Sequence, residues 1–445
     1  MCQILFKGLL KMVFRDMVEI KAFKGILYNE EKIKDLKLVV TPPYDVIDDK
    51  ERGEYSRFSD YNMVNLILGD KEDGYKKVAQ SFKEWQDKGI FKKDDEDSVY
   101  VYSQTFRYNG NTFTRTGFVS LVKLEELGKG ILPHEKTLEK PFKDRLSLLN
   151  AARANFGFVF ILYDDREKKI DGFLKNEVSE KRPDMDFEDK YGINHRLWKV
   201  SDRPFINRVR VEMQQYQCII ADGHHRYRSV LEFKKEHPEL EDALYTMCCF
   251  VNSFNEGLFI LPIDRFVFNL KNINVDNVLN ELAKYFKIEE VKDVKELISR
   301  VDSTKVMVDK TINLKNHVFG MYCFLNNKSY LLKLKDNNIL DKYSPDKTDV
   351  YRKLDVNILH QIVFKDILGI SEEDQYKGIH IEYTKGSKRA LDRLQKNHYQ
   401  FAFFLNAPLM REIFLTARAG ETMPQKSTYF YPKVYSGLVI NKIEK

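Results

Sequence analysis

One short segment constrains the fold of this chain more than any other: an apolar strand that runs through a glycine turn directly into a helix. Residues 218–221 are uniformly apolar, and Asp222-Gly223 interrupts them, as expected at the end of a buried strand. Residues 226–235 then continue as a helix. Because a strand and a helix joined so closely pack as a sheet and its covering layer, the segment predicts an α/β protein.

Strand and helix patterns recur along the rest of the chain. Alternating side chains on both sides of Asn109-Gly110-Asn111 predict a β-hairpin formed by residues 99–106 and 114–122. Further strands are expected at 20–28, 158–163, 246–251, 258–262 and 401–405, and helices at 72–88, 146–154, 354–368 and 409–418. Together these patterns predict mixed sheets, in the α/β (α+β) class.

The length of 445 residues is about three times the ~150 that typically form one domain, so we expect a multi-domain protein. The predicted segments are an N-terminal extension 1–17, an N-terminal α/β domain 18–165, a phosphate-loop region 166–270, a support domain 271–380 and a C-terminal segment 381–445 that returns to the functional site.

The composition excludes several classes of protein. Lys and Arg number 73 and Asp and Glu 67, which gives a net charge of only +6. A protein that coats nucleic acid would carry a stronger and more clustered positive charge. The hydrophobic fraction of 43% supplies enough material for a core and excludes a disordered chain. We therefore expect small-molecule partners and no nucleic acid, while the oligomeric state cannot be deduced.

The cysteines and the hydropathy indicate the compartment. The five cysteines include no CxxC pair, and Cys248 and Cys249 are neighbours in an apolar run. We expect buried reduced thiols, without a disulfide framework or a zinc site. No apolar run approaches the ~18 residues needed to span a bilayer, and the first residues lack a signal-peptide cleavage pattern. These features predict a cytoplasmic protein with no membrane partner.

The turn at Asp222-Gly223 is the first of four places where chemically capable residues gather. A helix that begins after a glycine turn presents backbone N–H groups and a partial positive charge, which favours an anion. His224, His225, Arg226 and Arg228 add donors suited to phosphate oxygens. Asp222 is a candidate ligand for Mg²⁺. The alternative is an Asp-Gly turn with a surface histidine pair.

The second place is the charged stretch from residue 133 to residue 145. A zinc-protease HExxH motif would need histidine at position 138, which is Leu138, so that interpretation fails. Glu135 among cations is a candidate general base or metal ligand. The candidate residues of this stretch are His134, Glu135, Thr137, Lys143 and Arg145. The alternative is a solvated charged face that caps the helix predicted from residue 146.

The third and fourth places lie at the two ends of the chain. Lys426, Ser427 and Thr428 form a plausible oxyanion-binding set without the glycines of a P-loop; the alternative is an aromatic strand packed on the core. Near the N-terminus, Pro42-Pro43 makes a rigid loop that carries Tyr44 and Asp45, with Asn62 nearby as a possible amide contact. The alternative there is a simple connector.

These motifs, taken in order, resemble a known family. They are 41–47 (TPPYDVI), 134–137 (HEKT) with 143–145 (KDR), 220–227 (IADGHHRY) and 423–433 (MPQKSTYFYPK). Together they are similar to a family long known only as a domain of unknown function and tied to free-serine kinases of the SerK type. The similarity runs from about residue 20 to residue 438. It implies phosphorylation of free L-serine to O-phospho-L-serine, with inorganic pyrophosphate as donor.

The resemblance implies roles for the candidate residues. The 222–226 stretch is similar to the phosphate loop of ParB/sulfiredoxin-like serine kinases, so Gly223, His224, His225, Arg226 and Arg228 would hold the donor, with Mg²⁺ at Asp222. Glu135 or Asp45 would accept the hydroxyl proton, and His225 would act beside them. The remaining roles are charge stabilisation by Lys143, Arg145, Lys426, Ser427 and Thr428, and substrate contacts by Tyr44, Asn62, His134 and Thr137.

Other functions remain open on the sequence alone. An ATP- or ADP-dependent serine kinase fits the same residues, although the chain lacks both GxGxxG and a P-loop, which favours a small donor. A ParB-like nucleotide- or nucleic-acid-binding protein would use the same His/Arg turn, and its affinity would fall steeply with salt. A sensor that binds a phosphorylated metabolite without turnover is the third alternative.

Overall fold

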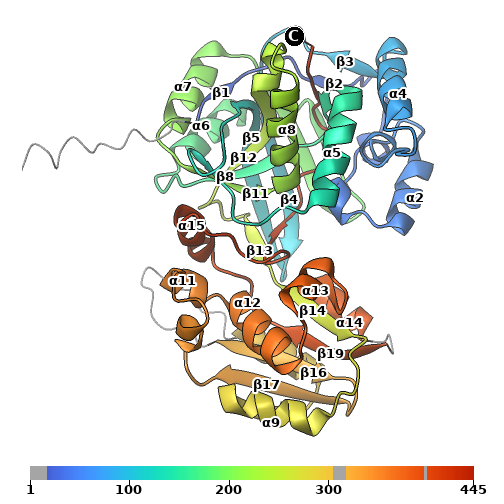
Figure 1. The fold of residues 1–445 in the computed structure, drawn as a ribbon. Helices are drawn as coiled ribbons and strands as arrows, with labels where there is room; N and C mark the ends of the chain where they lie inside the picture. Colours follow the sequence, from blue (N-terminus) through green and yellow to red (C-terminus); the bar gives the residue numbers. More distant parts are fainter. Residues whose placement is uncertain (1–17, 304–316, 395–397, 445) are drawn as a thin grey trace, which may run out of the picture. The chain divides into compact units, whose positions relative to one another are not determined.

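The chain divides into two compact units (Figure 1). The computed structural model describes residues 18–303, 317–394 and 398–444. Within them, unit 1 comprises 18–133, 137–259 and 432–444, and unit 2 comprises 134–136 and 260–431. These two units differ from the segments expected above: the boundaries at 165/166, 270/271 and 380/381 each fall inside a unit. The predicted extension 1–17 lies outside the described residues.

Unit 1 is built on a large mixed sheet. Its strand order is β6 (Ile131–Leu132), β11 (Cys218–Asp222), β8 (Val159–Tyr163), β12 (Tyr245–Asn252), β5 (Asn111–Lys123), β4 (Val99–Tyr108), β10 (Asn194–Val200) and β9 (Met185–Glu188), with β1 (Ile20–Lys21) beside β5. β11 is parallel to β6 and β12 to β8, while the other pairs are antiparallel. Tyr108 pairs with Asn111, which confirms the predicted hairpin. The mixed sheet confirms the α/β (α+β) class.

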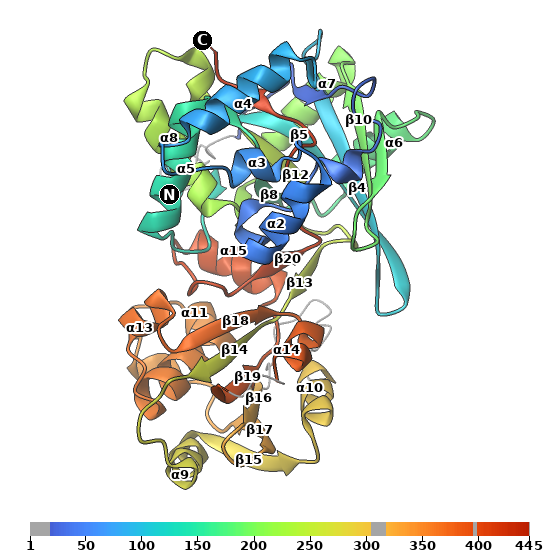
Figure 2. The same ribbon diagram turned by 90° about the vertical axis from the view of Figure 1, so that its right-hand side faces the viewer.

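Helices cover one face of this sheet. α5 (Glu139–Ala152) and α8 (His224–Glu236) lie side by side in Figure 1, with α6 (Lys169–Val178) and α7 (Arg203–Met213) beyond them. Their apolar side chains join those of β4, β5, β8, β11 and β12 in one core cluster. A second group of helices, α2 (Asp49–Phe58), α3 (Val64–Ile67) and α4 (Lys76–Asp87), is labelled in Figure 2. The short antiparallel pair β2 (Ile26–Tyr28) and β3 (Phe91–Lys93) is labelled near α4 in Figure 1.

The helix predicted at 146–154 begins seven residues earlier, at Glu139, and ends at Ala152. Pro141, which argues against a helix on sequence alone, occupies the first turn. A first-turn proline costs little there, because the N–H that it lacks would have no partner within the helix. As a result, Lys143, Asp144 and Arg145 lie on the helix itself, whereas we expected the helix to begin after them.

Unit 2 contains an antiparallel sheet with helical segments on both faces. Its strand order is β15 (Phe286–Val291), β17 (Lys328–Leu334), β16 (Val318–Cys323), β19 (Tyr399–Phe404), β14 (Ile263–Phe268) and β18 (Ile381–Lys385). Helix α10 (Val294–Ser303) packs on one face. On the other, Phe364 of the π-helical segment η5 (Leu359–Ile367) has its ring centroid 5.4 Å from that of Phe403. The helix predicted at 354–368 is therefore α12 (Asp355–Ile358) continued by η5.

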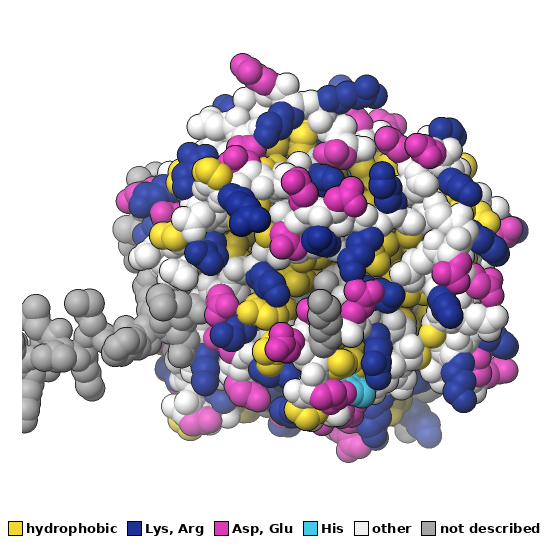
Figure 3. Space-filling model, turned by 90° about the horizontal axis from the view of Figure 1, so that it is seen from above, with side chains coloured by type: hydrophobic (Ala, Val, Ile, Leu, Met, Phe, Trp, Pro, Cys, Tyr) yellow, Lys and Arg dark blue, Asp and Glu magenta, His cyan; other side chains and the backbone are white. Residues whose placement is uncertain are grey.

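The surface and the cysteines agree with the composition. In the view of Figure 3, Lys and Arg side chains alternate with Asp and Glu over the visible face. The thiols of Cys218, Cys248, Cys249 and Cys323 are free and buried, as predicted; Cys2 lies outside the described residues. Among the helices that the structure describes, none is long and apolar enough to cross a bilayer.

Candidate functional site

The partly buried carboxylate of Asp222 is the centre of the polar residues around the glycine turn in unit 1. It stands at the end of β11, and its two oxygens accept from the Lys433 ammonium (2.9 Å) and the Arg226 guanidinium (2.8 Å). Burial raises the pKa of Asp222, but the charges of Lys433 and Arg226 outweigh that effect and hold it well below the ordinary value. The group is therefore a permanent anion that fixes two cations beside the turn.

The turn itself requires glycine. Gly223 has φ +91° and is the N-cap of α8, and a Cβ there would meet the Arg226 guanidinium at 3.0 Å. A Cβ on Gly157 would likewise approach Arg226 Nη1 to 3.4 Å. Both glycines thus leave room for Arg226, which also donates to the carbonyl of Phe158. The sequence-predicted turn and helix are confirmed, and Arg226 lies over the turn.

The end of the chain returns to this place within unit 1. Lys433 reaches Asp222 with its side chain, and its carbonyl accepts from Gln104 of β4 (2.9 Å). Three residues later, Ser436 pairs with Thr41, directly before the Pro42-Pro43 loop. Residues far apart in the sequence therefore meet: the first motif, the glycine turn and the end of the last motif.

A cavity of about 60 Å³ opens beside these residues in unit 1. Arg145, Arg226, Tyr44 and Ser436 contribute to its polar wall, and much of the remainder is apolar. By this measure a single water needs about 10–15 Å³, so the space exceeds one water. Two guanidinium groups on one small cavity favour an anionic ligand.

His225 and Arg228 connect α8 to the beginning of α5. His225 Nε2 accepts from the backbone N–H of Leu138 (2.8 Å), the residue before α5, so in this conformation that nitrogen carries no proton. Arg228 bonds Glu139 (2.8 Å) and Thr137 Oγ1 (3.3 Å) and lies 3.8 Å from the Phe142 ring centroid. These predicted phosphate-binding and substrate-binding side chains therefore have structural partners here.

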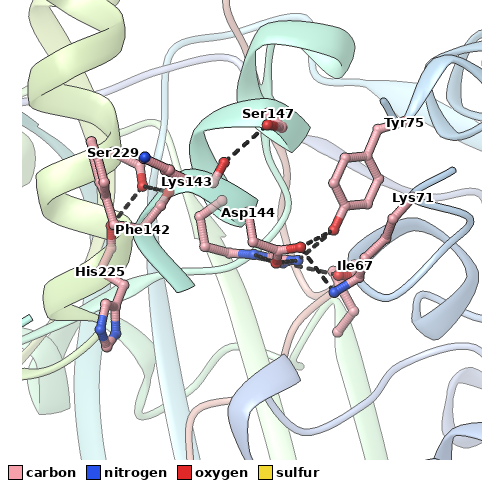
Figure 4. A network of polar contacts seen from close by, with 10 residues as sticks. Ile67, Lys71, Tyr75, Phe142, Lys143, Asp144, Ser147, His225 and Ser229 are labelled. Atoms are coloured by element: carbon pink, nitrogen blue, oxygen red, sulfur yellow. Dashed lines mark hydrogen bonds and ion pairs between the residues drawn. The ribbon is translucent and has the colours of Figure 1, made fainter. Parts of the chain in front are cut away.

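Arg145 belongs to a buried network that joins α5 to the α3–α4 connection (Figure 4). Its guanidinium contacts Asp144 Oδ2 (2.6 Å), the Tyr75 hydroxyl (3.0 Å) and the Ile67 carbonyl (2.9 Å). Asp144 Oδ1 also accepts from Lys71 and Tyr75, both at 2.8 Å. Burial raises the pKa of Asp144, but Arg145 and Lys71 lower it overall. Arg145 thus has a structural role besides lining the cavity.

The other predicted site residues of unit 1 differ in burial and in their contacts. Tyr44 stacks on Arg145, with 4.1 Å from its ring centroid to the guanidinium carbon, whereas its neighbour Asp45 is exposed. Asn62 is fully buried and bonds the backbone of Leu38 (2.7 Å) and Val64 (2.9 Å), which accounts for it structurally. Lys143 points to solvent, 71% exposed.

The remaining candidates gather in unit 2. His134 is buried, with Nε2 3.0 Å from Thr428 Oγ1, and its carbonyl accepts from Met423 N (2.8 Å). Glu135 pairs with Met423 as an isolated parallel bridge. Lys426 has φ +57°, and Ser427 donates to the Pro424 carbonyl (2.5 Å). Residues 134–135 and the 423–428 segment thus meet within unit 2.

The residues around Asp222 do not fit a Mg²⁺ site. Both carboxylate oxygens are taken by cations, and two neighbouring positive charges oppose a divalent ion. In the part of the chain that the structure describes, no group of three or more His, Cys, Asp or Glu side chains is arranged to hold a metal. In this structure Asp222 is the ion-pair acceptor of Arg226 and Lys433, and the Mg²⁺ ligand role expected for it does not fit.

Sequence reasoning missed the polar residues of the sheet itself. Arg115 on β5 is 2% exposed, contacts Gln104 of β4, and lies 4.9 Å over the Phe160 ring. Beyond them, His195 bonds Tyr102 (2.6 Å) and lies 3.2 Å from an oxygen of Asp189. A signal was present: Arg115 and Gly117 interrupt an otherwise alternating strand on the face opposite Phe118.

Comparison with known proteins identifies the family. The family described as "Protein of unknown function (DUF1015)" matches residues 20–357, so the chain belongs to this family. The match spans the first three motifs and confirms the domain-of-unknown-function family; the motif at 423–433 lies outside the matched residues. Among curated proteins, none matches.

Several solved structures are distantly similar. A conserved hypothetical protein from Pyrococcus furiosus is 14% identical, with TM-score 0.33, covering 68% of this chain and 89% of that one. A free serine kinase mutant in complex with ADP is 12% identical, with TM-score 0.35, covering 68% and 84%. SbnI from Staphylococcus aureus, truncated at its C-terminus, is 12% identical, with TM-score 0.33, covering 72% and 85%. Likeness at this level carries no argument about activity.

Proposed function

We propose that this protein is a phosphotransferase that phosphorylates free L-serine to O-phospho-L-serine, with inorganic pyrophosphate as the donor. The observation that carries the proposal is the arrangement at the Gly223 turn. Arg226 and Lys433 converge on Asp222 there, at the beginning of α8 and beside a cavity that Arg145 also lines. The motif resemblance supplies the substrate and the donor.

Phosphoryl transfer needs positioning and charge neutralisation more than covalent help from the protein. Asp222 keeps Arg226 and Lys433 in place in the absence of donor, and the donor's oxygens compete for the same two cations. The helix N-terminus adds its partial positive charge. With Gly223 leaving the backbone accessible, these groups would hold a phosphate and stabilise the charge that develops on it.

The serine hydroxyl must lose a proton to a general base. The proposed base is Asp45, which is exposed beside Tyr44 in unit 1. His225 is a weaker choice, because its Nε2 already accepts from Leu138. A divalent cation such as Mg²⁺ would enter bound to the donor, since Asp222 is occupied by cations.

The test is direct. Purified full-length protein is incubated with L-serine, Mg²⁺ and pyrophosphate, ATP or ADP in separate reactions, and O-phosphoserine is measured by mass spectrometry. We expect product with pyrophosphate. Product with only a nucleotide would keep the kinase but change the donor, and absence of product with all three would overturn the proposal.

Variants locate the site. Arg226→Met and Lys433→Met should each lower kcat/KM by about a hundredfold, the typical effect of removing a group that stabilises transition-state charge. Arg196→Ala is the matched control, because Arg196 lies 48% exposed in an ion pair with Asp186 elsewhere in unit 1. Its rate should be unchanged. Asp45→Asn tests the proposed base and should lower kcat.

A further inference from the structure

A buried glutamine on β4 connects the interior of the unit 1 sheet to the last segment of the chain. Gln104 is 1% exposed and lies directly opposite Arg115 of β5, which is 2% exposed. Its Oε1 accepts from the Arg115 guanidinium, and its Nε2 donates to the backbone carbonyl of Lys433 (2.9 Å). Both ends of the side-chain amide are therefore in use, as expected of a buried polar group.

The two partners determine which way the amide of Gln104 points. A guanidinium can only donate and a backbone carbonyl can only accept, so the amide oxygen faces Arg115 and the amide nitrogen faces Lys433. Arg115 is in turn held by the ring of Phe160, with 4.9 Å between the guanidinium carbon and the ring centroid. Phe160 of β8 is the register partner of Asp222 in β11. The contacts therefore lead from the Asp222 strand pair through the sheet to Lys433, and Lys433 leads back to Asp222.

Lys433 needs such a contact because the chain around it is irregular. It lies outside any strand, three residues before the bridge of Ser436 with Thr41. A lysine ammonium sits at the end of a flexible four-carbon stem, so its position depends on where the backbone is held. The hydrogen bond from Gln104 holds the carbonyl of Lys433 in the conformation in which the ammonium lies 2.9 Å from Asp222 Oδ1.

We propose that Gln104 is a positioning residue of the donor site: it aims the ammonium of Lys433, and Arg115 keeps the amide of Gln104 in the orientation that this requires. This role rests on the proposed function, because Lys433 is one of the two cations that would hold the donor. Gln104 acts through Lys433 and not on the reacting atoms. Since its hydrogen bond is to the backbone, the bond persists when the ammonium exchanges Asp222 for an oxygen of the donor.

A double-mutant cycle on the full-length protein tests the coupling. Pyrophosphate affinity is measured by isothermal titration calorimetry, and kcat/KM for pyrophosphate by O-phosphoserine formation. Gln104→Met should lower both by about three- to tenfold, the size expected for one lost hydrogen bond. In the Lys433→Met background the same substitution should change them by less than about twofold, because the residue that it positions is gone. A residue with only a structural role would have the same effect in both backgrounds.

Two further variants separate the contacts of the amide. Gln104→Glu keeps an acceptor for Arg115 but turns a carboxylate oxygen, in place of an N–H, toward the Lys433 carbonyl. It should therefore weaken pyrophosphate binding at least as much as Gln104→Met, and it provides the test if Gln104→Met folds poorly. Wild-type affinity in Gln104→Glu would overturn the proposal. Gln80→Met is the matched control and should change nothing, since Gln80 is exposed and donates to Glu84 within α4.

Chemical labelling of Lys433 gives a readout that does not depend on the proposed activity. The side chain is only 8% exposed, so its rate of acetylation by acetic anhydride, followed by mass spectrometry, reports how firmly the ammonium is held. The rate should rise by about three- to tenfold in Gln104→Met and stay constant in Gln80→Met. An unchanged rate in Gln104→Met, or equal effects in both backgrounds of the cycle, would overturn the positioning role. Absence of O-phosphoserine would instead overturn the kinase, and labelling would still decide the role of Gln104.

Discussion

Asp144→Asn tests whether the network of Figure 4 holds unit 1 together. The substitution removes the only negative charge of the network as described and leaves Arg145, 6% exposed, without its carboxylate. Breaking a buried ion pair from one side costs about 3–5 kcal/mol. Since Asp144 is itself 19% exposed and its second partner Lys71 is 51% exposed, solvent screening lowers the expected loss to about 2–3 kcal/mol.

Urea unfolding followed by tryptophan fluorescence measures this loss in unit 1 alone. The two tryptophans of the chain, Trp85 and Trp198, both lie in unit 1 and are buried. With an m-value of about 3 kcal/mol/M, the midpoint should fall by nearly 1 M. Lys143→Ala is the control on the same helix: it removes an exposed pair with Glu139 at 3.8 Å and should cost less than about 0.5 kcal/mol.

The pH dependence gives a second check with a definite sign. The folded-state pKa of Asp144 lies below the ordinary value, so its contribution to stability is fully present above the unfolded pKa of about 3.8. It is lost as the pH falls through the lower folded value. The gap between wild type and Asp144→Asn should therefore be constant from pH 5 to 7 and shrink toward pH 2. Equal midpoints for the Asp144 and Lys143 variants at pH 7 would refute the structural role.

Two other outcomes follow from the structure. Gly223→Ala should lower kcat/KM and should lower the unfolding free energy of unit 1 by about 1–2 kcal/mol, because φ is +91° and the new Cβ would displace Arg226. The control is Gly172→Ala in α6, where the Cβ has open space around it. In the same urea assay it should raise the unfolding free energy by about 0.5–1 kcal/mol. For Asp264, whose pKa is raised to about 8 by burial, the folded state retains a proton that the unfolded state loses above about pH 4, so stability should fall as the pH rises from 4 to 8. Asp264→Asn should flatten that decline, as measured by hydrogen exchange in peptides of β14, and an unchanged slope would contradict a protonated carboxyl.

Sequence patterns predicted most helices and strands, because turns and helix ends are determined by interactions between residues close in the sequence. The Asn109-Gly110 turn supplies the positive φ values that a tight hairpin needs, and both residues have them, at 48° and 82°. Gly223 likewise marked the beginning of α8. The start of α5 was missed because Pro141 and its charged neighbours resemble a loop, whereas a first-turn proline is compatible with a helix.

The grouping of site residues was only partly visible in the sequence. The pairing of Thr41 with Ser436 and of Asp222 with Lys433 depends on tertiary contacts that no periodicity reports. The same holds for Asn62, which looked like a ligand contact but caps local backbone groups.

The discontinuous make-up of unit 1 has a consequence for how the chain matures on the ribosome. Residues 432–444 belong to unit 1, yet they are translated after all of 260–431. At about 5–20 residues per second, those roughly 170 residues occupy the ribosome for about ten to thirty seconds. Throughout that interval Asp222 has Arg226 but not Lys433. A nascent chain stalled in this interval would contain all strands of the unit 1 sheet but only one of the two cations that contact Asp222. The unit 1 site is therefore completed only after residues 432–444 are synthesised.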